Sequence, residues 1–140
     1  MKRIEQSGNL IALIIDTAAD FKPGVHFISD PTWPLQIGLL AHRGGHSIPA
    51  HRHFERQNTG KTMTQEFLLV VSGEMEVDFY DAEGSLFCSE KLLPGQALLQ
   101  IRGGHGFRFP ASSQVLELKI GPYLGLDQDK QFIAQAVAKS

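Results

Sequence analysis

The chain has 140 residues, of which 42% are hydrophobic and 20% are charged. This length and composition predict one globular domain over residues 1–140 and exclude a disordered chain. The formal net charge of −2 gives no basic surface for nucleic acid, and no apolar run reaches the roughly 20 residues that span a bilayer. The single cysteine, Cys88, excludes an internal disulfide and fits a reducing cytoplasm.

Short strands separated by turn signals run through the chain. The first is expected at residues 10–15, and the clearest element is a hairpin whose residues 75–80 alternate between apolar and more polar side chains. Residues 81–84, DAEG, form its turn, and residues 86–93 return. Many short strands with glycine and proline between them are typical of an all-β sandwich or barrel. Further strands are expected to begin at Glu66, after the Pro94–Gly95 turn and at Val115.

One helix is expected, at the C-terminus. Asp127 can cap a run in which Phe132, Ile133 and Ala136 fall on one helical face, with Lys139 near its end. Because so short a helix is unstable alone, we expect it to dock on the barrel or on a second subunit.

Four of the six histidines lie in the stretch HRGGHSIPAHRH, residues 42–53. His51 and His53 are two residues apart, so on a strand both imidazoles project from the same face and can bind one metal ion. Such a pair is also common on a solvated strand face, so this spacing alone is a weak signal. His26, His42 and His46 are expected to be ordinary surface or rim residues, although His46 could line the barrel mouth.

Two later residues strengthen the metal interpretation. Glu66 opens the apolar strand EFLLVVSG on the same face as Leu68 and Val70, where a carboxylate is costly unless it is paired or bound to a cation. The alternative is a residue at the strand edge that still reaches solvent. His105 follows Gly103 and Gly104; a lone histidine there is more often a core or rim residue.

The order of these residues resembles the two sequence motifs of the cupin family. Five residues separate Gly45 from the His51–His53 pair, and six separate Glu66 from Gly73. The second motif corresponds to residues 95–109, where Gly95 and Gly103 precede His105. The resemblance implies a jelly-roll barrel, or double-stranded β-helix, that holds one divalent metal through His51, His53, Glu66 and His105.

The chain departs from the cupin pattern at several positions. Twelve residues, FERQNTGKTMTQ, separate His53 from Glu66 where the family usually has three or four. This insertion is interpreted as a mobile flap near the metal, and it offers Glu55 as a rival carboxylate ligand. In the second motif, Ile101 replaces the usual proline and Phe109 stands where an asparagine is frequent.

Such a site would suit several chemistries. Three imidazoles and a carboxylate leave two octahedral positions open, which suits iron, manganese, nickel or cobalt, and zinc can bind with fewer ligands. The first hypothesis is a dioxygenase or isomerase acting on a small polar metabolite, such as a sugar or a keto or diol compound, inside the barrel. The alternatives are non-catalytic binding of a sugar or organic acid, and a structural dimer stiffened by metal. Homodimerisation is expected because exposed edge strands of small barrels commonly pair.

Other residues are candidates for substrate contacts. Glu117 and Lys119 share the strand face of Val115 and could act as a base and as a partner for an anionic substrate; two charges on a solvated face are an equally good interpretation. The candidates for substrate binding are His46 at the barrel mouth, Arg102 at the rim and Phe107. The alternatives are solvent exposure for Arg102 and plain packing for Phe107.

Overall fold

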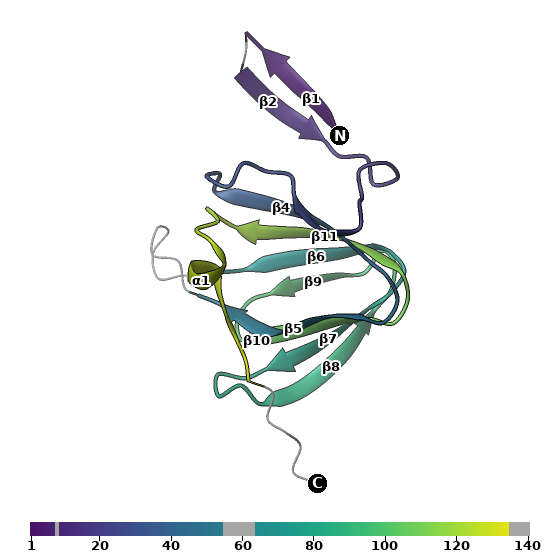
Figure 1. Ribbon diagram of the computed structural model, residues 1–140, viewed down its shortest axis with the longest axis vertical. Helices are drawn as coiled ribbons and strands as arrows, with labels where there is room; N and C mark the ends of the chain where they lie inside the picture. The colour runs from purple at the N-terminus through teal and green to yellow at the C-terminus, as the bar shows by residue number, and fades with distance from the viewer. Residues whose placement is uncertain (8, 55–63, 135–140) are drawn as a thin grey trace.

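Two five-stranded antiparallel sheets form a barrel, as the computed structural model shows (Figure 1). It describes residues 1–7, 9–54 and 64–134. One sheet has the order β12 (Lys130–Phe132), β5 (His46–His53), β10 (Gly104–Phe109), β7 (Met75–Tyr80) and β8 (Leu86–Leu92). The other has the order β3 (Gly24–Phe27), β4 (Leu35–His42), β11 (Ser113–Ile120), β6 (Glu66–Ser72) and β9 (Ala97–Gln100).

Strands that are distant in sequence lie side by side in both sheets. β5 pairs with β10, and β4 pairs with β11 over its full length. This interleaving wraps the two sheets into the double-stranded β-helix that the resemblance to the cupin motifs implies. The hairpin of β7 and β8 also lies where the alternating pattern placed it.

The inward face of the barrel changes from polar to apolar along the strands. In β6, Glu66 is followed on the same face by Leu68 and Val70, and all three are buried. The register pairs Lys119 of β11 with Glu66 and Val115 with Val70, so the polar ends of these strands lie together. The apolar half forms the core, which consists of Leu40, Leu68, Val70, Met75, Val77, Leu92, Phe107, Phe109 and Val115.

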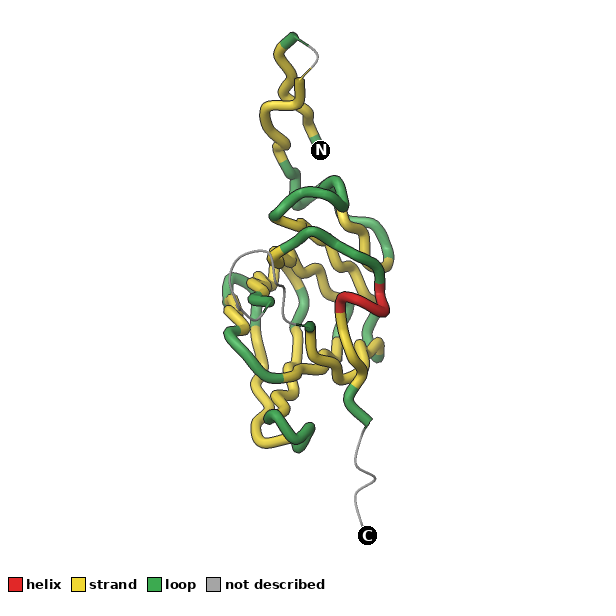
Figure 2. Tube along the Cα trace, turned by 90° about the vertical axis from the view of Figure 1, so that its left-hand side faces the viewer, coloured by secondary structure: helices red, strands yellow, loops and turns green. Residues whose placement is uncertain are grey.

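A separate hairpin precedes the barrel. The expected first strand is present as β2 (Asn9–Ile14), but it pairs with β1 (Lys2–Gln6), which the sequence analysis did not anticipate. Both views show this hairpin projecting from one end of the molecule (Figures 1 and 2). A two-stranded hairpin is marginally stable in water by itself.

The expected C-terminal helix is present but much shorter than its sequence pattern indicated. α1 (Leu126–Asp129) is a single turn, and Phe132, assigned to the helical face, lies instead in β12. The prediction of a helix through Phe132 was wrong because residues 130–132 hydrogen-bond to the edge of β5, a non-local pairing that outweighs local helical periodicity. Ala136 and Lys139 lie outside the described residues.

Within the described residues, no helix combines the length and apolar character needed to cross a membrane.

Candidate metal centre

Three imidazoles converge at the polar end of the barrel. His51 on β5 lies directly opposite His105 on β10, and His53 follows two residues along β5. One ring nitrogen from each of the three lies within 4.8 Å of the others. Cross-strand neighbours and same-face neighbours are the closest side-chain pairs in a sheet, which explains why this spacing gathers the rings.

Glu66 approaches these rings from the opposite sheet. Its Oε1 atom lies 2.8 Å from His53 Nε2, and its Oε2 atom lies 3.2 Å from His105 Nε2. Its side chain is only 3% exposed. The structure therefore brings together all four residues proposed as metal ligands, whereas the rival Glu55 and most of the expected flap lie outside the described residues.

Two of the imidazoles are oriented as ligands of a metal would be. His51 Nδ1 donates a hydrogen bond to the carbonyl oxygen of Pro49 at 2.8 Å, which leaves the Nε2 lone pair available. His53 Nδ1 lies 3.0 Å from Asp129 Oδ2, so its Nε2 faces Glu66. A metal-binding histidine usually has its second nitrogen held by a carbonyl or carboxylate in this way.

The third imidazole is buried with little compensation. His105 is 1% exposed, and within the described part of the chain neither of its ring nitrogens makes a hydrogen bond of good geometry. The two ring nitrogens of His53 also lack a hydrogen bond of good geometry there. Buried polar atoms are nearly always hydrogen-bonded, so two buried imidazoles that only approach carboxylates need an explanation. A divalent cation accepts nitrogen and carboxylate oxygen ligands, so the donor set fits one.

The pKa shifts reflect the same surroundings. Burial, reinforced by the charge of His105, lowers the pKa of His51 to about 3, so this ring stays neutral. Burial would also lower the pKa of His53, but contacts with the carboxylates of Asp129 and Glu66 raise it to about 8. Burial would raise the pKa of Glu66, yet His105 and His53 hold it well below its usual value. The cluster thus combines a neutral nitrogen donor with ionised oxygens.

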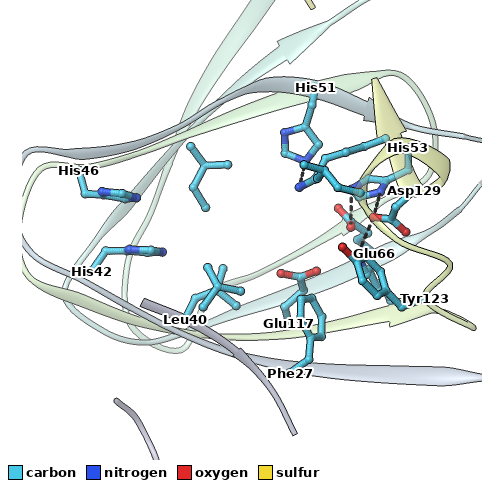
Figure 3. Close-up of a pocket in the computed structure, with 15 residues that line it drawn as sticks. Phe27, Leu40, His42, His46, His51, His53, Glu66, Glu117, Tyr123 and Asp129 are labelled. Carbon is cyan, nitrogen blue, oxygen red and sulfur yellow. Dashed lines mark hydrogen bonds and ion pairs between the residues drawn. The ribbon is translucent and has the colours of Figure 1, made fainter. Parts of the chain in front are cut away.

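A cavity of about 200 Å³ adjoins this cluster. Glu117 and Lys119 both line it, as Figure 3 shows for Glu117, so they face inward rather than outward to bulk water. Burial, and then the charge of Glu66, raise the pKa of Glu117 to about 7. Lys119 Nζ lies 4.9 Å from the centre of the Phe27 ring and 5.4 Å from that of Tyr123. The cavity wall therefore contains both titratable side chains and aromatic rings.

The other candidates for substrate contacts occupy different places. His46 lines the far end of the cavity, stacked on His42 with ring centres 4.1 Å apart (Figure 3). His42 is half-buried there, at the cavity wall. Arg102 is exposed and lines a separate pocket with Arg52. Phe107 belongs to the core and stacks on His105, with ring centres 4.7 Å apart.

Sequence reasoning missed two residues of the cluster, Asp129 and Lys130. Asp129 is 1% exposed and contacts His53, and its Oδ2 also accepts a hydrogen bond from Lys119 Nζ at 2.8 Å. Lys130 Nζ lies 3.4 Å from His51 Nε2. Both stand where α1 meets β12, and β12 pairs Lys130 with His53. The sequence carries no local signal for that pairing.

Comparisons with known proteins identify the fold. No family model matches the sequence, and no curated protein matches it significantly. A protein with a double-stranded β-helix domain from Klebsiella pneumoniae aligns with a TM-score of 0.65 at 14% identity, covering 89% of this chain and 100% of that one. An RmlC-like cupin from Desulfovibrio desulfuricans aligns with a TM-score of 0.53 at 18% identity, covering 86% of this chain and 99% of that one.

An enzyme is among the similar structures. A variant of oxalate decarboxylase from Bacillus subtilis aligns with a TM-score of 0.54 at 14% identity, over 71% of this chain and 24% of that longer one. These likenesses show that the chain has the cupin fold, which confirms the fold expected from the two motifs.

Proposed function

We propose that this cupin-fold chain binds one divalent metal ion through His51, His53, Glu66 and His105 and converts a small polar metabolite in the adjoining cavity. The observation that supports this most directly is the approach of Glu66, from one sheet, to within 3.2 Å of two imidazoles of the other. A metal bound there would take four donors from three strands, the three clustered imidazoles and the Glu66 carboxylate. Three nitrogens and one carboxylate suit iron, manganese, nickel or cobalt, and zinc at lower coordination number.

The proposed reaction is of the dioxygenase or isomerase type. The metal would supply Lewis-acid polarisation of a substrate oxygen or, if redox-active, dioxygenation chemistry. Glu117 lines the cavity, and a carboxyl group whose pKa is about 7 can take up and return a proton near neutral pH. Phe27, Leu40 and Tyr123 would limit water around the substrate (Figure 3).

The experiment has a metal step and a turnover step. Elemental analysis of the purified protein is expected to show about one divalent metal per chain. Turnover is then assayed with diols, diketones and keto-sugars, following oxygen consumption and product isomers. We expect Glu117→Gln to retain the metal and lose about 10²- to 10⁴-fold in turnover, the usual contribution of a general base. A protein without metal contradicts the proposal; binding without turnover favours the non-catalytic alternative, capture of a sugar or organic acid.

We also propose that the chain forms a homodimer. The outward face of the β3–β4–β11–β6–β9 sheet carries exposed apolar side chains, among them Leu35, Phe67 and Leu99, which are 50%, 36% and 54% exposed. The same uncharged face on a second copy can cover it without like charges meeting.

The unpaired Cys88 is compatible with the reducing cytoplasm.

Light scattering tests the dimer. The wild type is expected to have twice the chain mass, and Leu99→Asp is expected to shift it to the monomer because a charge would be buried at the interface. Leu86→Asp is the matched control, since Leu86 is also 54% exposed but lies in β8, in the other sheet. Equal masses for the two variants would contradict the assigned face.

A further inference from the structure

Lys130 brings a positive charge to the metal cluster. It lies on the edge strand β12, opposite His53, and its side chain reaches across to the neighbouring ring. Its Nζ atom lies 3.4 Å from His51 Nε2, the nitrogen that is not used in the hydrogen bond to Pro49. The ammonium therefore points at the lone pair that the proposed site uses for its metal.

The two cavity lysines differ in their partners. Lys119 is tied to Asp129 by an ion pair of 2.8 Å in which neither side chain is more than 3% exposed. Lys130 makes no ion pair with a carboxylate among the described residues. It lines the cavity and is half-buried. A half-buried ammonium without a carboxylate partner is available to an anionic ligand.

With a metal bound, the site would need an anionic ligand beside Lys130. A divalent cation on His51 Nε2 would lie close to the Lys130 ammonium, and the two positive charges would repel each other. A ligand with one negative charge placed between them would relieve this repulsion. A neutral sugar could not, and a multiply charged ligand would face the carboxylates of Glu66 and Asp129 in the same wall.

We propose that the ligand of this cavity is a small monocarboxylate, such as a 2-hydroxy or 2-oxo acid, whose carboxylate is held between the metal and Lys130. The inference rests on the proposed metal site and names the ligand class for it. The cavity volume of about 200 Å³ suits an acid of a few carbon atoms. Because both cations hold the same carboxylate, binding of the acid and binding of the metal are thermodynamically coupled.

Titration calorimetry with Mn²⁺, in the presence and absence of saturating lactate, tests this coupling. Lactate is expected to tighten Mn²⁺ binding to the wild type by a factor in the usual range of about 5- to 150-fold. Lactamide, which has the same shape without the charge, is expected to have no effect. Lys130→Met is expected to bind Mn²⁺ at least as tightly as the wild type without lactate, and to lose the coupling.

Two further variants complete the test. Lys130→Arg keeps the positive charge and is expected to keep most of the coupling. Lys22→Met, which removes an exposed lysine outside this cavity, is expected to behave as the wild type. Full coupling in Lys130→Met, or equal effects of lactate and lactamide, would overturn the inference while leaving the metal site in place. A wild type that binds no Mn²⁺, Fe²⁺, Co²⁺, Ni²⁺ or Zn²⁺ would overturn the proposed function, and the inference with it.

Discussion

Replacing His51 by alanine is expected to remove most of the bound metal and leave the barrel folded. His51 Nε2 is held toward the cluster by the Nδ1 bond to Pro49, so its loss removes one of four donors. Losing an outer partner of a ligand typically costs 10- to 100-fold in metal affinity, so losing a ligand is expected to cost at least about 100-fold. Elemental analysis and a metal titration measure this loss, and circular dichroism reports the fold.

A matched variant tests whether metal is lost only when a histidine of the site is replaced, or when any histidine is. His26 is exposed on β3, and its Nε2 contacts only the carbonyl oxygen of Pro23 among the hydrogen bonds seen. His26→Ala is therefore expected to keep its metal. Metal binding also stabilises the folded state, by about 2.7 kcal/mol at a concentration of 100 times Kd. Added metal is thus expected to raise the melting temperature of the wild type and His26→Ala, but not of His51→Ala. Equal metal content in His51→Ala and the wild type would remove His51 from the site.

Lys119→Met is expected to lower the free energy of unfolding by about 3 to 5 kcal/mol, the usual cost of removing one partner from a buried ion pair. Lys119 and Asp129 are 3% and 0% exposed as side chains, and their contact of 2.8 Å joins α1 to β11. Without the lysine, Asp129 keeps a buried charge that has lost one of its cationic partners and still lies 3.0 Å from His53 Nδ1. Urea denaturation monitored by fluorescence measures the change.

Two further variants test whether the loss of stability comes from burial of the ion pair. Lys91 forms an ion pair with Glu74 at the surface, where the lysine is 50% exposed. Lys91→Met is expected to leave the unfolding free energy nearly unchanged because solvent screens such pairs. Adding Asp129→Asn to Lys119→Met removes the buried carboxylate charge and is expected to recover part of the lost stability. Equal losses for Lys119→Met and Lys91→Met would show that the buried pair is not coupled to folding.

Part of the metal cluster could be predicted from the sequence because the facing of its residues along one strand is a local property. Two residues separated by one position on a strand share a face, so the facing of His51 and His53 follows from their spacing. The same alternation placed Glu66 with Leu68 and Val70, and Glu117 with Lys119. The family resemblance supplied what spacing alone did not, namely that these strands and His105 belong to one barrel.

Local patterns failed where a distant strand decided the structure. Residues around Phe132 have helical periodicity, yet they extend as β12 because the edge of β5 offers backbone partners. That pairing brings Asp129 to His53 and Lys130 to His51, over sequence separations of 76 and 79 residues. Likewise, alternation could not decide whether Glu117 and Lys119 face water or a cavity.

By itself, the sequence determined several strands and the residues that share a face on each of them, because these depend on residues close together in the chain; the set of potential metal ligands followed from the family resemblance. The tertiary structure decided which faces meet. It brought Glu66 across from the opposite sheet and added Asp129 and Lys130 to the cluster. It also set the N-terminal hairpin apart from the barrel. Each of these depends on pairing between segments far apart in the chain, whose free energy no local pattern contains.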